Sequence, residues 1–371
     1  MKAVILLVVF LTVSSCDSML LGREDQIISL KENLAVPPQL DDGLEVGSMA
    51  EAGIDEEAIT RLISSLQSDN RNIHSVLIIK NGRLVVESYF NGWHRNRLQS
   101  IRSASKSVTS ALLGIAIDHG LIESEDERVF AFFPEYVDLR TEDKDKILLR
   151  HLLMMSAGLQ WNQTSFADDD PRNDEVQLGQ SVDGFRFVLQ KNYVHTAGTT
   201  FNYSSGNTDL LAGVIYHASG MYADDFAEKF LFKPLGIEQV GWRKNNNGHP
   251  NAGFGIHLYP RDFMKFGKLF LDSGVWNNQQ VLSKAWVAKS TAKMIDYPSD
   301  NNQGYGYQWW TREWEVNGKK IKSFQAQGNG GQVLCVIPDL RTVVLMTGGN
   351  YGTAGQLPYR YIQELLLPAL K

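Results

Sequence analysis

The sequence predicts an α+β fold: an antiparallel sheet, built from N- and C-terminal segments and flanked by helices, that carries a large, mainly helical insertion at about 107–250. Near one end, two β-rich runs at 75–80 and 83–90 are joined by Asn81-Gly82, a pair typical of a two-residue hairpin turn. Near the other end lie four more β-rich runs, at 305–312, 322–325, 332–337 and 342–347. Strands at both ends, with helices and loops between them, favour one sheet to which both ends contribute.

Apolar residues at helical spacing predict the helices that flank this sheet. They are expected at 55–68, 103–119, 262–273 and 356–370. Within the insertion, a helix is expected to continue through 210–217, with Asn207 and Asp209 capping its start. The second helix differs from the others, because no charged residue occurs between Lys106 and Asp118. We therefore expect it to be buried.

Composition excludes several classes of function. The chain has 371 residues, a net charge of −6 and 43% hydrophobic residues, which suits a globular protein with a large core. No stripe of Lys and Arg is visible, so nucleic acid is not expected as a partner. The eight histidines form no H-E-x-x-H and no Cys/His pattern, so no metal or other cofactor is expected. Cys335, inside an apolar run, is expected to be a buried strand residue without chemistry.

The N-terminal end has the features of a targeting segment. Lys2 precedes an apolar run at 3–13, which is too short to span a bilayer but has the proportions of a signal peptide at 1–15. Small residues directly before Cys16 resemble a bacterial lipobox, which implies cleavage there and acylation of the cysteine. The alternative is an ordinary signal peptide in which Cys16 is incidental. The lipobox predicts an exported bacterial lipoprotein on the periplasmic or cell-surface side of a membrane, held by its lipid anchor.

The rest of the chain divides into a tether and one domain. Residues 16–46 are mixed and polar, with two consecutive prolines, and we interpret them as a tether that begins at the lipidated cysteine. Residues 47–371 then form the folded domain. No internal repeat or low-complexity segment is visible.

Ser103 and Lys106 are the first candidates for catalysis. A serine hydroxyl is a poor nucleophile unless a nearby base takes its proton. Residues three apart on a helix share one face, so a neutral Lys106 could accept the proton of Ser103. A lone lysine at the start of an uncharged helix is costly unless it works or is paired. The same helix start offers the backbone N–H of Ser103 to a developing oxyanion.

The spacing alone is weak evidence, because the chain contains a second pair of this kind, Ser290 and Lys293. Its surroundings are charged, so we interpret it as part of an exposed helix. No G-x-S-x-G occurs, so a nucleophile elbow is not supported. A Ser-His-Asp triad stays open, since its members can lie far apart in a sequence.

Six segments, in order along the chain from about Gly47, carry a family resemblance. They are Ser103-Ala-Ser-Lys106, Leu152-Leu-Met-Met-Ser-Ala-Gly-Leu159, Ala197-Gly-Thr-Thr-Phe-Asn-Tyr-Ser-Ser205, Lys233-Pro-Leu-Gly236, Arg261-Asp-Phe-Met-Lys-Phe-Gly267 and Gln327-Gly-Asn-Gly-Gly-Gln332. With these segments the chain resembles the serine β-lactamase and penicillin-recognising superfamily. It is most similar to the class C-like branch that includes family VIII esterases and 6-aminohexanoate-dimer hydrolase. The resemblance implies a β-lactamase/transpeptidase-like fold.

The second catalytic motif of that family, Y-x-N, corresponds here to Tyr203-Ser204-Ser205. The resemblance implies that Tyr203 relays a proton to the leaving group. Ser205 occupies the place of the asparagine, as in the 6-aminohexanoate-dimer hydrolase branch. The missing amide puts recognition of a substrate in the β-lactamase manner in doubt.

The third motif, K-T-G or H-x-G, corresponds to Gln327-Gly328-Asn329. The resemblance implies that Gly328 permits close approach to a ligand, and that the N–H of Asn329 joins that of Ser103 in binding the oxyanion. No lysine is present at Gln327, so an anchor for a substrate carboxylate is absent. Trp161 is a further candidate for the wall of the substrate pocket.

These residues together predict a serine hydrolase that acts on an ester or amide bond of a small molecule through an acyl-enzyme. Ser103 attacks, Lys106 is the base and Tyr203 protonates the leaving group. Carboxylesterase or amidase activity ranks first, β-lactamase second and D-amino-acid peptidase third. The alternative from another class is a non-catalytic ligand-binding or sensor protein that keeps the fold, against which the intact serine, lysine and tyrosine argue.

Overall fold

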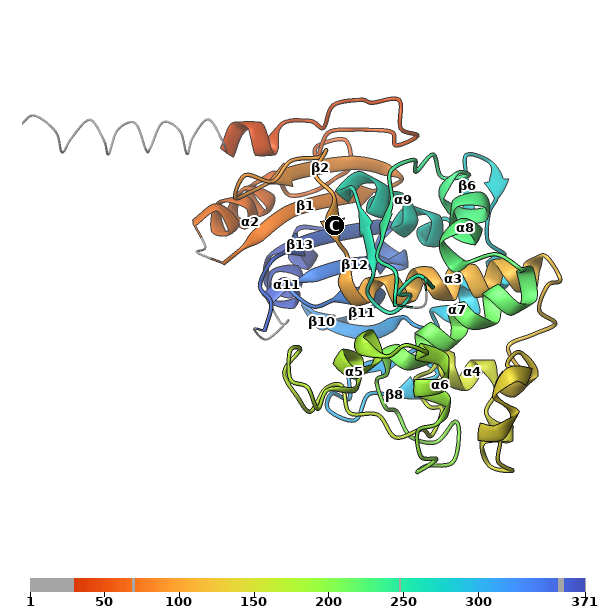
Figure 1. The fold of residues 1–371 in the computed structure, drawn as a ribbon. Helices are drawn as coiled ribbons and strands as arrows, with labels where there is room; N and C mark the ends of the chain where they lie inside the picture. The colour runs from red at the N-terminus through yellow and green to blue at the C-terminus, as the bar shows by residue number, and fades with distance from the viewer. Residues whose placement is uncertain (1–29, 69–70, 247, 353–356, 371) are drawn as a thin grey trace, which may run out of the picture.

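The computed structural model describes residues 30–68, 71–246, 248–352 and 357–370, and it has the expected α+β architecture (Figure 1). Within these residues, one antiparallel sheet has eight strands in the order β2-β1-β13-β12-β11-β10-β9-β8. The strands are β1 (Ile73–Lys80), β2 (Arg83–Tyr89), β8 (Ile295–Asp296), β9 (Gln303–Tyr305), β10 (Trp310–Val316), β11 (Lys319–Gly328), β12 (Gln332–Ile337) and β13 (Thr342–Gly348). Because β1 lies beside β13, both ends of the chain build the sheet, and the predicted fold class is confirmed.

Two details of the strands follow from local backbone geometry. Asn81 and Gly82 both have positive φ, at 51° and 86°, which a tight hairpin turn of this type requires. The single strand predicted at 305–312 is wrong, because β9 ends at its first residue, Tyr305, and β10 begins only at Trp310. Gln308 adopts a φ of 64° between them, and this left-handed residue turns the chain instead of extending it.

Helices cover both faces of the sheet, so its central strands are buried on both sides. On one face lie α2 (Glu56–Ser68), α11 (Leu357–Tyr361), a π-helical turn (Ile362–Leu366) and α12 (Leu367–Ala369). The other face packs against α3 (Ser105–Asp118) and α9 (Pro260–Leu271). Alternate residues of β1 divide accordingly: Val76 and Ile78 join the first core, while Leu77 and Ile79 join the second. The helix predicted at 356–370 consists of three short helical segments, and the last of them has a proline in its first turn.

The middle of the chain forms the helical insertion, which contacts the sheet domain through the packing of α7 against α3 (Figure 1). Its helices are α4 (Leu149–Leu153), α5 (Asp174–Gln180), α6 (Gly184–Leu189), α7 (Ser205–Ser219), α8 (Ala223–Ala227) and a π-helical turn (Glu228–Phe232). Its short 3-10 turns are Val129–Ala131, Pro134–Leu139 and Lys144–Lys146. The predicted caps of the 210–217 helix are wrong, because α7 begins earlier and Ser204 accepts from the N–H of Asn207. Asn207 and Asp209 therefore lie inside the helix.

Smaller elements complete the chain. A three-stranded sheet joins β3 (Gln99–Ser100), β5 (Ile256–Leu258) and β4 (Gly241–Trp242), and its strand β3 lies shortly before α3 in the sequence. The remaining elements are β6 (Val275–Trp276), β7 (Gln279–Gln280), α10 (Lys284–Ser290) and a 3-10 turn (Pro338–Leu340). The second Ser–Lys pair does not form the exposed helix that we predicted. Ser290 is buried at the end of α10, while Lys293 lies beyond it and pairs with Asp296.

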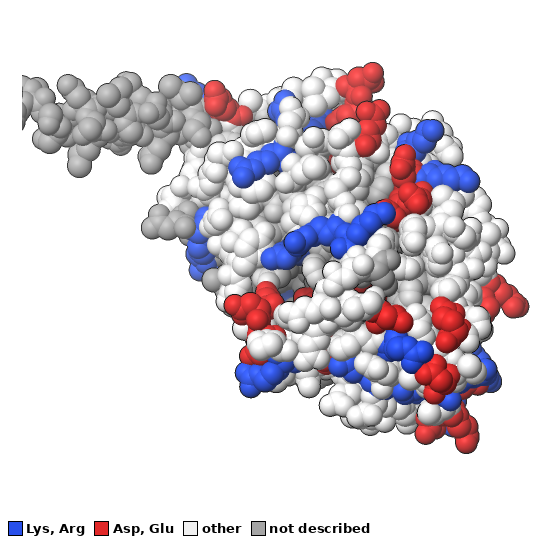
Figure 2. Space-filling view, viewed as in Figure 1, with Lys and Arg blue, Asp and Glu red and all other residues white. Residues whose placement is uncertain are grey.

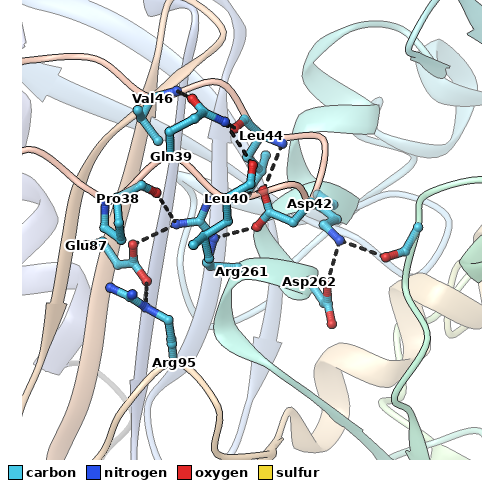
Figure 3. Close-up of polar contacts among 12 residues, drawn as sticks. Pro38, Gln39, Leu40, Asp42, Leu44, Val46, Glu87, Arg95, Arg261 and Asp262 are labelled. Carbon is cyan, nitrogen blue, oxygen red and sulfur yellow. Dashed lines mark hydrogen bonds and ion pairs between the residues drawn. The ribbon is translucent and has the colours of Figure 1, made fainter.

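The described part of the predicted tether is attached to the domain. Asn33 accepts from Ser88 and Tyr89 of β2, and Leu44 is buried. Arg261 of α9 bonds to Asp42 at 2.6 Å and to Glu87 at 2.8 Å (Figure 3). The prediction of a tether through residue 46 therefore needs correction, because Leu30 and Leu34 already pack against the core of the domain and Asn33 bonds to β2. Cys16 and the predicted signal peptide lie outside the described residues.

Arg261 is the centre of this attachment. Its side chain is buried, and a buried charge requires partners that satisfy its N–H groups. Burial alone would raise the pKa of Asp42, but the hydrogen bonds and the charge of Arg261 outweigh it and lower that pKa. A second bond, from Arg95 to Glu87, extends the group to the surface.

Charge on the face shown in Figure 2 is mixed: acidic and basic side chains are interspersed, with one basic band across the middle. Within the described residues, no helix is long and apolar enough to cross a membrane. The same residues contain no group of three or more His, Cys, Asp or Glu side chains that could hold a metal ion. Cys335 is buried in β12, as expected, and burial raises the pKa of its thiol to about 12.

Candidate active site

Ser103 lies in a 3-10 turn between β3 and α3, and it is only partly buried. Arg102, directly before it, has a φ of 52°, a left-handed conformation that a residue with a side chain adopts at some cost. The turn is held on both sides. The N–H of Ile101 donates to Ile256 at 3.0 Å, and Ser105 donates to the carbonyl of Arg102 at 2.6 Å. The serine hydroxyl is therefore presented from a braced turn at the start of a buried helix.

Lys106 is only 1% exposed, and three oxygens surround its amine. Its Nζ lies 3.3 Å from Oγ of Ser103, 2.9 Å from Oγ of Ser205 and 2.8 Å from the carbonyl oxygen of Gly253. From Ser107 to Ala116 the helix α3 is buried, which excludes water from the amine on that side. The structure thus brings together the serine and lysine that the sequence paired, and adds Ser205 to them.

A polar network continues from Ser205 to two residues that sequence reasoning did not find. The hydroxyl of Ser205 contacts the carboxylate of Glu175 and accepts from the amide of Gln163 at 3.0 Å. Gln163 also donates to Glu175 at 2.8 Å and accepts from the N–H of Ser205 at 2.8 Å. Both new residues lie at least 30 positions before Ser205, so no spacing pattern could connect them to it.

The loop before α5 holds these two side chains in place. Asn173 is fully buried, donates to the carbonyls of Gln163 and Ala167 at 3.1 Å, and accepts from the N–H of Glu175 at 2.9 Å. One asparagine therefore fixes both ends of the loop and caps α5. Asp174 adds a second brace through a 2.6 Å ion pair with Lys191.

Asp209 is a further buried acid close to the amine. Its carboxylate accepts from the N–H groups of Ala252 at 3.0 Å and Gly253 at 3.3 Å, and from Asn245 at 3.1 Å. Burial raises the pKa of Asp209 to about 6, although these hydrogen bonds and the charge of Lys106 oppose the shift. Asp209 thus holds the backbone segment whose carbonyl faces Lys106.

Tyr203 stands at the entrance to α7, immediately before the capping Ser204. Its ring stacks on Trp310 with centroids 5.8 Å apart and planes at 26°. The amine of Lys106 lies 4.9 Å from the centre of the ring. The structure therefore places the predicted proton relay beside the lysine, on an aromatic support from β10.

The third motif lies against the turn of the nucleophile. Gly328 ends β11, and a Cβ atom added to it would come within 2.3 Å of the carbonyl of Ile101 and 2.9 Å of the side chain of Arg102. Only glycine fits this close approach. Asn329 follows directly, and its side chain donates to Asp168 on the insertion loop. Gln327 bonds to Gln325 at 2.9 Å along the same strand. The oxyanion role of the Asn329 N–H stays a prediction.

Trp161 is 5% exposed and packs behind the site. Its ring lies against Gly206 of α7, where an added Cβ would meet it at 2.8 Å, and its N–H donates to Gln163 at 3.0 Å. The described contacts of Trp161 therefore support Gln163, and direct contact with a substrate stays a prediction.

The model of the Beta-lactamase family matches residues 61–366 of this sequence. The chain belongs to the Beta-lactamase family. This assignment places it in a family of hydrolases and confirms the predicted superfamily.

Two kinds of relatives agree with the family. Over 289 residues the chain is 24% identical to 6-aminohexanoate-dimer hydrolase from Paenarthrobacter ureafaciens, covering 72% of this chain and 70% of that protein. A solved structure from Bacillus anthracis, provisionally named as a 6-aminohexanoate-dimer hydrolase, has a TM-score of 0.70 at 19% identity, over 91% of this chain and 87% of its own. A family VIII carboxylesterase has a TM-score of 0.68 at 14% identity, over 87% and 99%. At these identities the two solved structures show the fold.

Proposed function

We propose that this member of the Beta-lactamase family is a serine hydrolase that cleaves an ester or amide bond through an acyl-enzyme on Ser103. The observation that carries the proposal is the 3.3 Å contact between Oγ of Ser103 and the buried amine of Lys106. In its neutral form that amine is a base within reach of the serine proton. The relatives named above include a 6-aminohexanoate-dimer hydrolase and a family VIII carboxylesterase, which favours this chemistry.

Two steps complete the reaction. In the first, Ser103 Oγ bonds to the substrate carbonyl carbon, its proton passes to Lys106, and the carbonyl oxygen becomes an oxyanion bound by the N–H groups of Ser103 and Asn329. The bond to the leaving group then breaks as Tyr203 gives it a proton, and Lys106 returns a proton to Tyr203. In the second step water attacks the acyl carbon, loses its proton through the same groups, and frees the Ser103 hydroxyl.

The preferred substrate is an ester or open-chain amide and not a β-lactam. Ser205 stands where β-lactamases have an asparagine, and its hydroxyl is occupied by Lys106, Gln163 and Glu175. Gln327 stands where they have a lysine, and its amide bonds along the strand. The site therefore lacks the two side chains that would hold a β-lactam amide and carboxylate.

Turnover of two chromogenic substrates tests this function. We expect hydrolysis of p-nitrophenyl butyrate, loss of that activity in Ser103→Ala, and little or no hydrolysis of nitrocefin. Nitrocefin turnover that exceeds ester turnover would reassign the protein as a β-lactamase. Turnover of neither substrate by folded protein, together with no reaction with a fluorophosphonate, would favour a binding protein that keeps the fold.

We also propose that the chain is an exported lipoprotein anchored through Cys16. The proposal rests on the sequence before that residue, which resembles a lipobox. Expression of the full chain and of Cys16→Ser, followed by separation of membrane and soluble fractions, tests it. We expect the wild-type protein in the membrane fraction with an acylated N-terminal cysteine, and the variant without lipid. Equal fractionation and no lipid on either protein would contradict the anchor.

A further inference from the structure

Glu175 takes no part in the two-step reaction, yet its carboxylate lies two hydrogen bonds from the amine of Lys106. We propose that Glu175 is a positioning residue that fixes the direction of the hydrogen bonds around Lys106, so that the lone pair of the neutral amine faces Ser103. The inference rests on the proposed function, because it deepens the role of the same base.

The direction of each hydrogen bond in this network follows from which groups can only donate and which can only accept. The amide of Gln163 is oriented by two obligate donors, the N–H of Ser205 and the indole N–H of Trp161, which both bond to its oxygen. Its nitrogen therefore faces Ser205 and Glu175 and donates to both. An ionised Glu175 can only accept.

The hydroxyl of Ser205 has one proton and two lone pairs. Gln163 can only donate to it, at 3.0 Å, and Glu175 can only accept from it. The Ser205 proton is thus committed to Glu175. The remaining lone pair of Ser205 is left as an acceptor for Lys106, at 2.9 Å.

A neutral lysine has two N–H bonds and one lone pair. The carbonyl of Gly253, at 2.8 Å, accepts one N–H, and the committed Ser205 accepts the other. The lone pair is then left for the third neighbour, Ser103, at 3.3 Å. Glu175 in this way selects the one arrangement in which Lys106 can take the proton from the nucleophile.

Loss of the acceptor at Glu175 frees the Ser205 proton to turn toward Lys106. It would then occupy the lone pair that Ser103 needs, and the amine would face the nucleophile with an N–H instead. Ser103 would then react more slowly although its position is unchanged. The effect should therefore reach Lys106 only through Ser205.

Two substitutions of Glu175 distinguish its role as a hydrogen-bond acceptor from the effect of its negative charge. Glu175→Gln keeps the oxygen that accepts from Ser205 and Gln163 but removes the charge, whereas Glu175→Met keeps the length and removes both. The readout is the second-order rate of Ser103 labelling by a fluorophosphonate, with kcat and KM for p-nitrophenyl butyrate alongside. We expect Glu175→Gln to stay within about 3-fold of wild type, and Glu175→Met to lose between about 10- and 100-fold in labelling rate and kcat with KM little changed.

A double-mutant cycle with Ser205→Ala tests the route of the effect. In that background we expect Glu175→Met to cost less than about 2-fold, because the group through which it acts is gone. Gln177→Met is the matched control on the same helix, since its side chain bonds to the carbonyl of Pro171 away from the site. It should leave the labelling rate unchanged, and thermal melts of all variants report the folded fraction.

Equal losses in Glu175→Gln and Glu175→Met would overturn the proposal in favour of a charge effect. Losses that multiply independently in the Ser205→Ala background, or no loss in Glu175→Met, would overturn it as well. Failure of the proposed function has a different signature, namely labelling of the protein that persists in Ser103→Ala.

Discussion

The carbonyl of Gly253 accepts a hydrogen bond of 2.8 Å from the amine of Lys106. The N–H of the same glycine donates at 3.3 Å to Asp209, a carboxylate buried inside α7. A backbone segment thus lies between a buried acid and a buried base whose side chains do not bond to each other. The position of the Lys106 amine therefore depends on how firmly Asp209 fixes the backbone at Gly253.

Asp209→Ala should impair both stability and activity. The substitution leaves the N–H groups of Ala252 and Gly253 without their acceptor, and an unsatisfied buried donor costs about 1–3 kcal/mol. The released Gly253 carbonyl would no longer fix one N–H of Lys106, so kcat should fall together with the free energy of unfolding. Urea denaturation and ester turnover measure the two effects. Wild-type kcat in a folded Asp209→Ala protein would contradict the positioning of Lys106 through Gly253.

The stability of the protein should depend on pH through the same acid. Burial raises the pKa of Asp209 to about 6 from an ordinary value of 3.8. Between these two pH values the folded state therefore keeps a proton that the unfolded chain releases. The contribution of Asp209 to stability is therefore greatest below pH 4 and declines as the pH rises toward 6, by on the order of 3 kcal/mol.

Urea denaturation at half-unit steps from pH 4 to pH 7 measures this slope. Asp209→Asn carries no titrating group, so the difference between its stability curve and that of the wild type isolates the contribution of Asp209. A difference that is constant across this window would contradict the raised pKa.

Lys106→Met should separate activity from stability. Removal of the base should lower kcat by about 10²- to 10⁴-fold. The methionine keeps an apolar chain of similar volume but leaves the carbonyl of Gly253 without its donor, so the free energy of unfolding should fall by no more than about 1–3 kcal/mol and the protein should stay folded. Parallel turnover and thermal melts test both parts. A variant that unfolds, or one that retains wild-type turnover, would argue for a structural lysine.

Gly328→Ala should reduce the reactivity of Ser103 by moving the turn on which Ser103 lies. The added methyl group would lie 2.3 Å from the carbonyl of Ile101, too close for any real contact, so the turn that presents Ser103 must shift. We expect a loss of about 1–3 kcal/mol in stability and a clear fall in kcat/KM. Gly179→Ala is the matched control, because nothing lies within 4 Å of its added Cβ, and it should leave turnover unchanged. Equal turnover in both variants would contradict the packing of β11 against the nucleophile turn.

The sequence predicted those parts of the molecule that depend on local patterns. The hairpin at Asn81-Gly82, the charge-free helix α3 and the pairing of Ser103 with Lys106 all follow from residues close together in the chain. The strand expected through Gln308 failed, because nothing in the local pattern revealed its left-handed backbone.

The site residues that the sequence did not reveal were missed for a different reason. Gln163 lies on a loop of the insertion and Glu175 in the first turn of α5. Asp209 looked like a helix cap because the true cap, Ser204, lies five positions earlier. Their contacts with the site exist only after the insertion folds against α3. Only the tertiary structure, or a set of related sequences, contains that information.

Mass spectrometry of the protein after reaction with a fluorophosphonate tests the central claim most directly. The proposed mechanism predicts one adduct per chain, located by peptide mapping on Ser103, formed slowly in Lys106→Met and absent in Ser103→Ala. An adduct on another serine, or labelling that persists without Ser103, would contradict the assignment of the nucleophile.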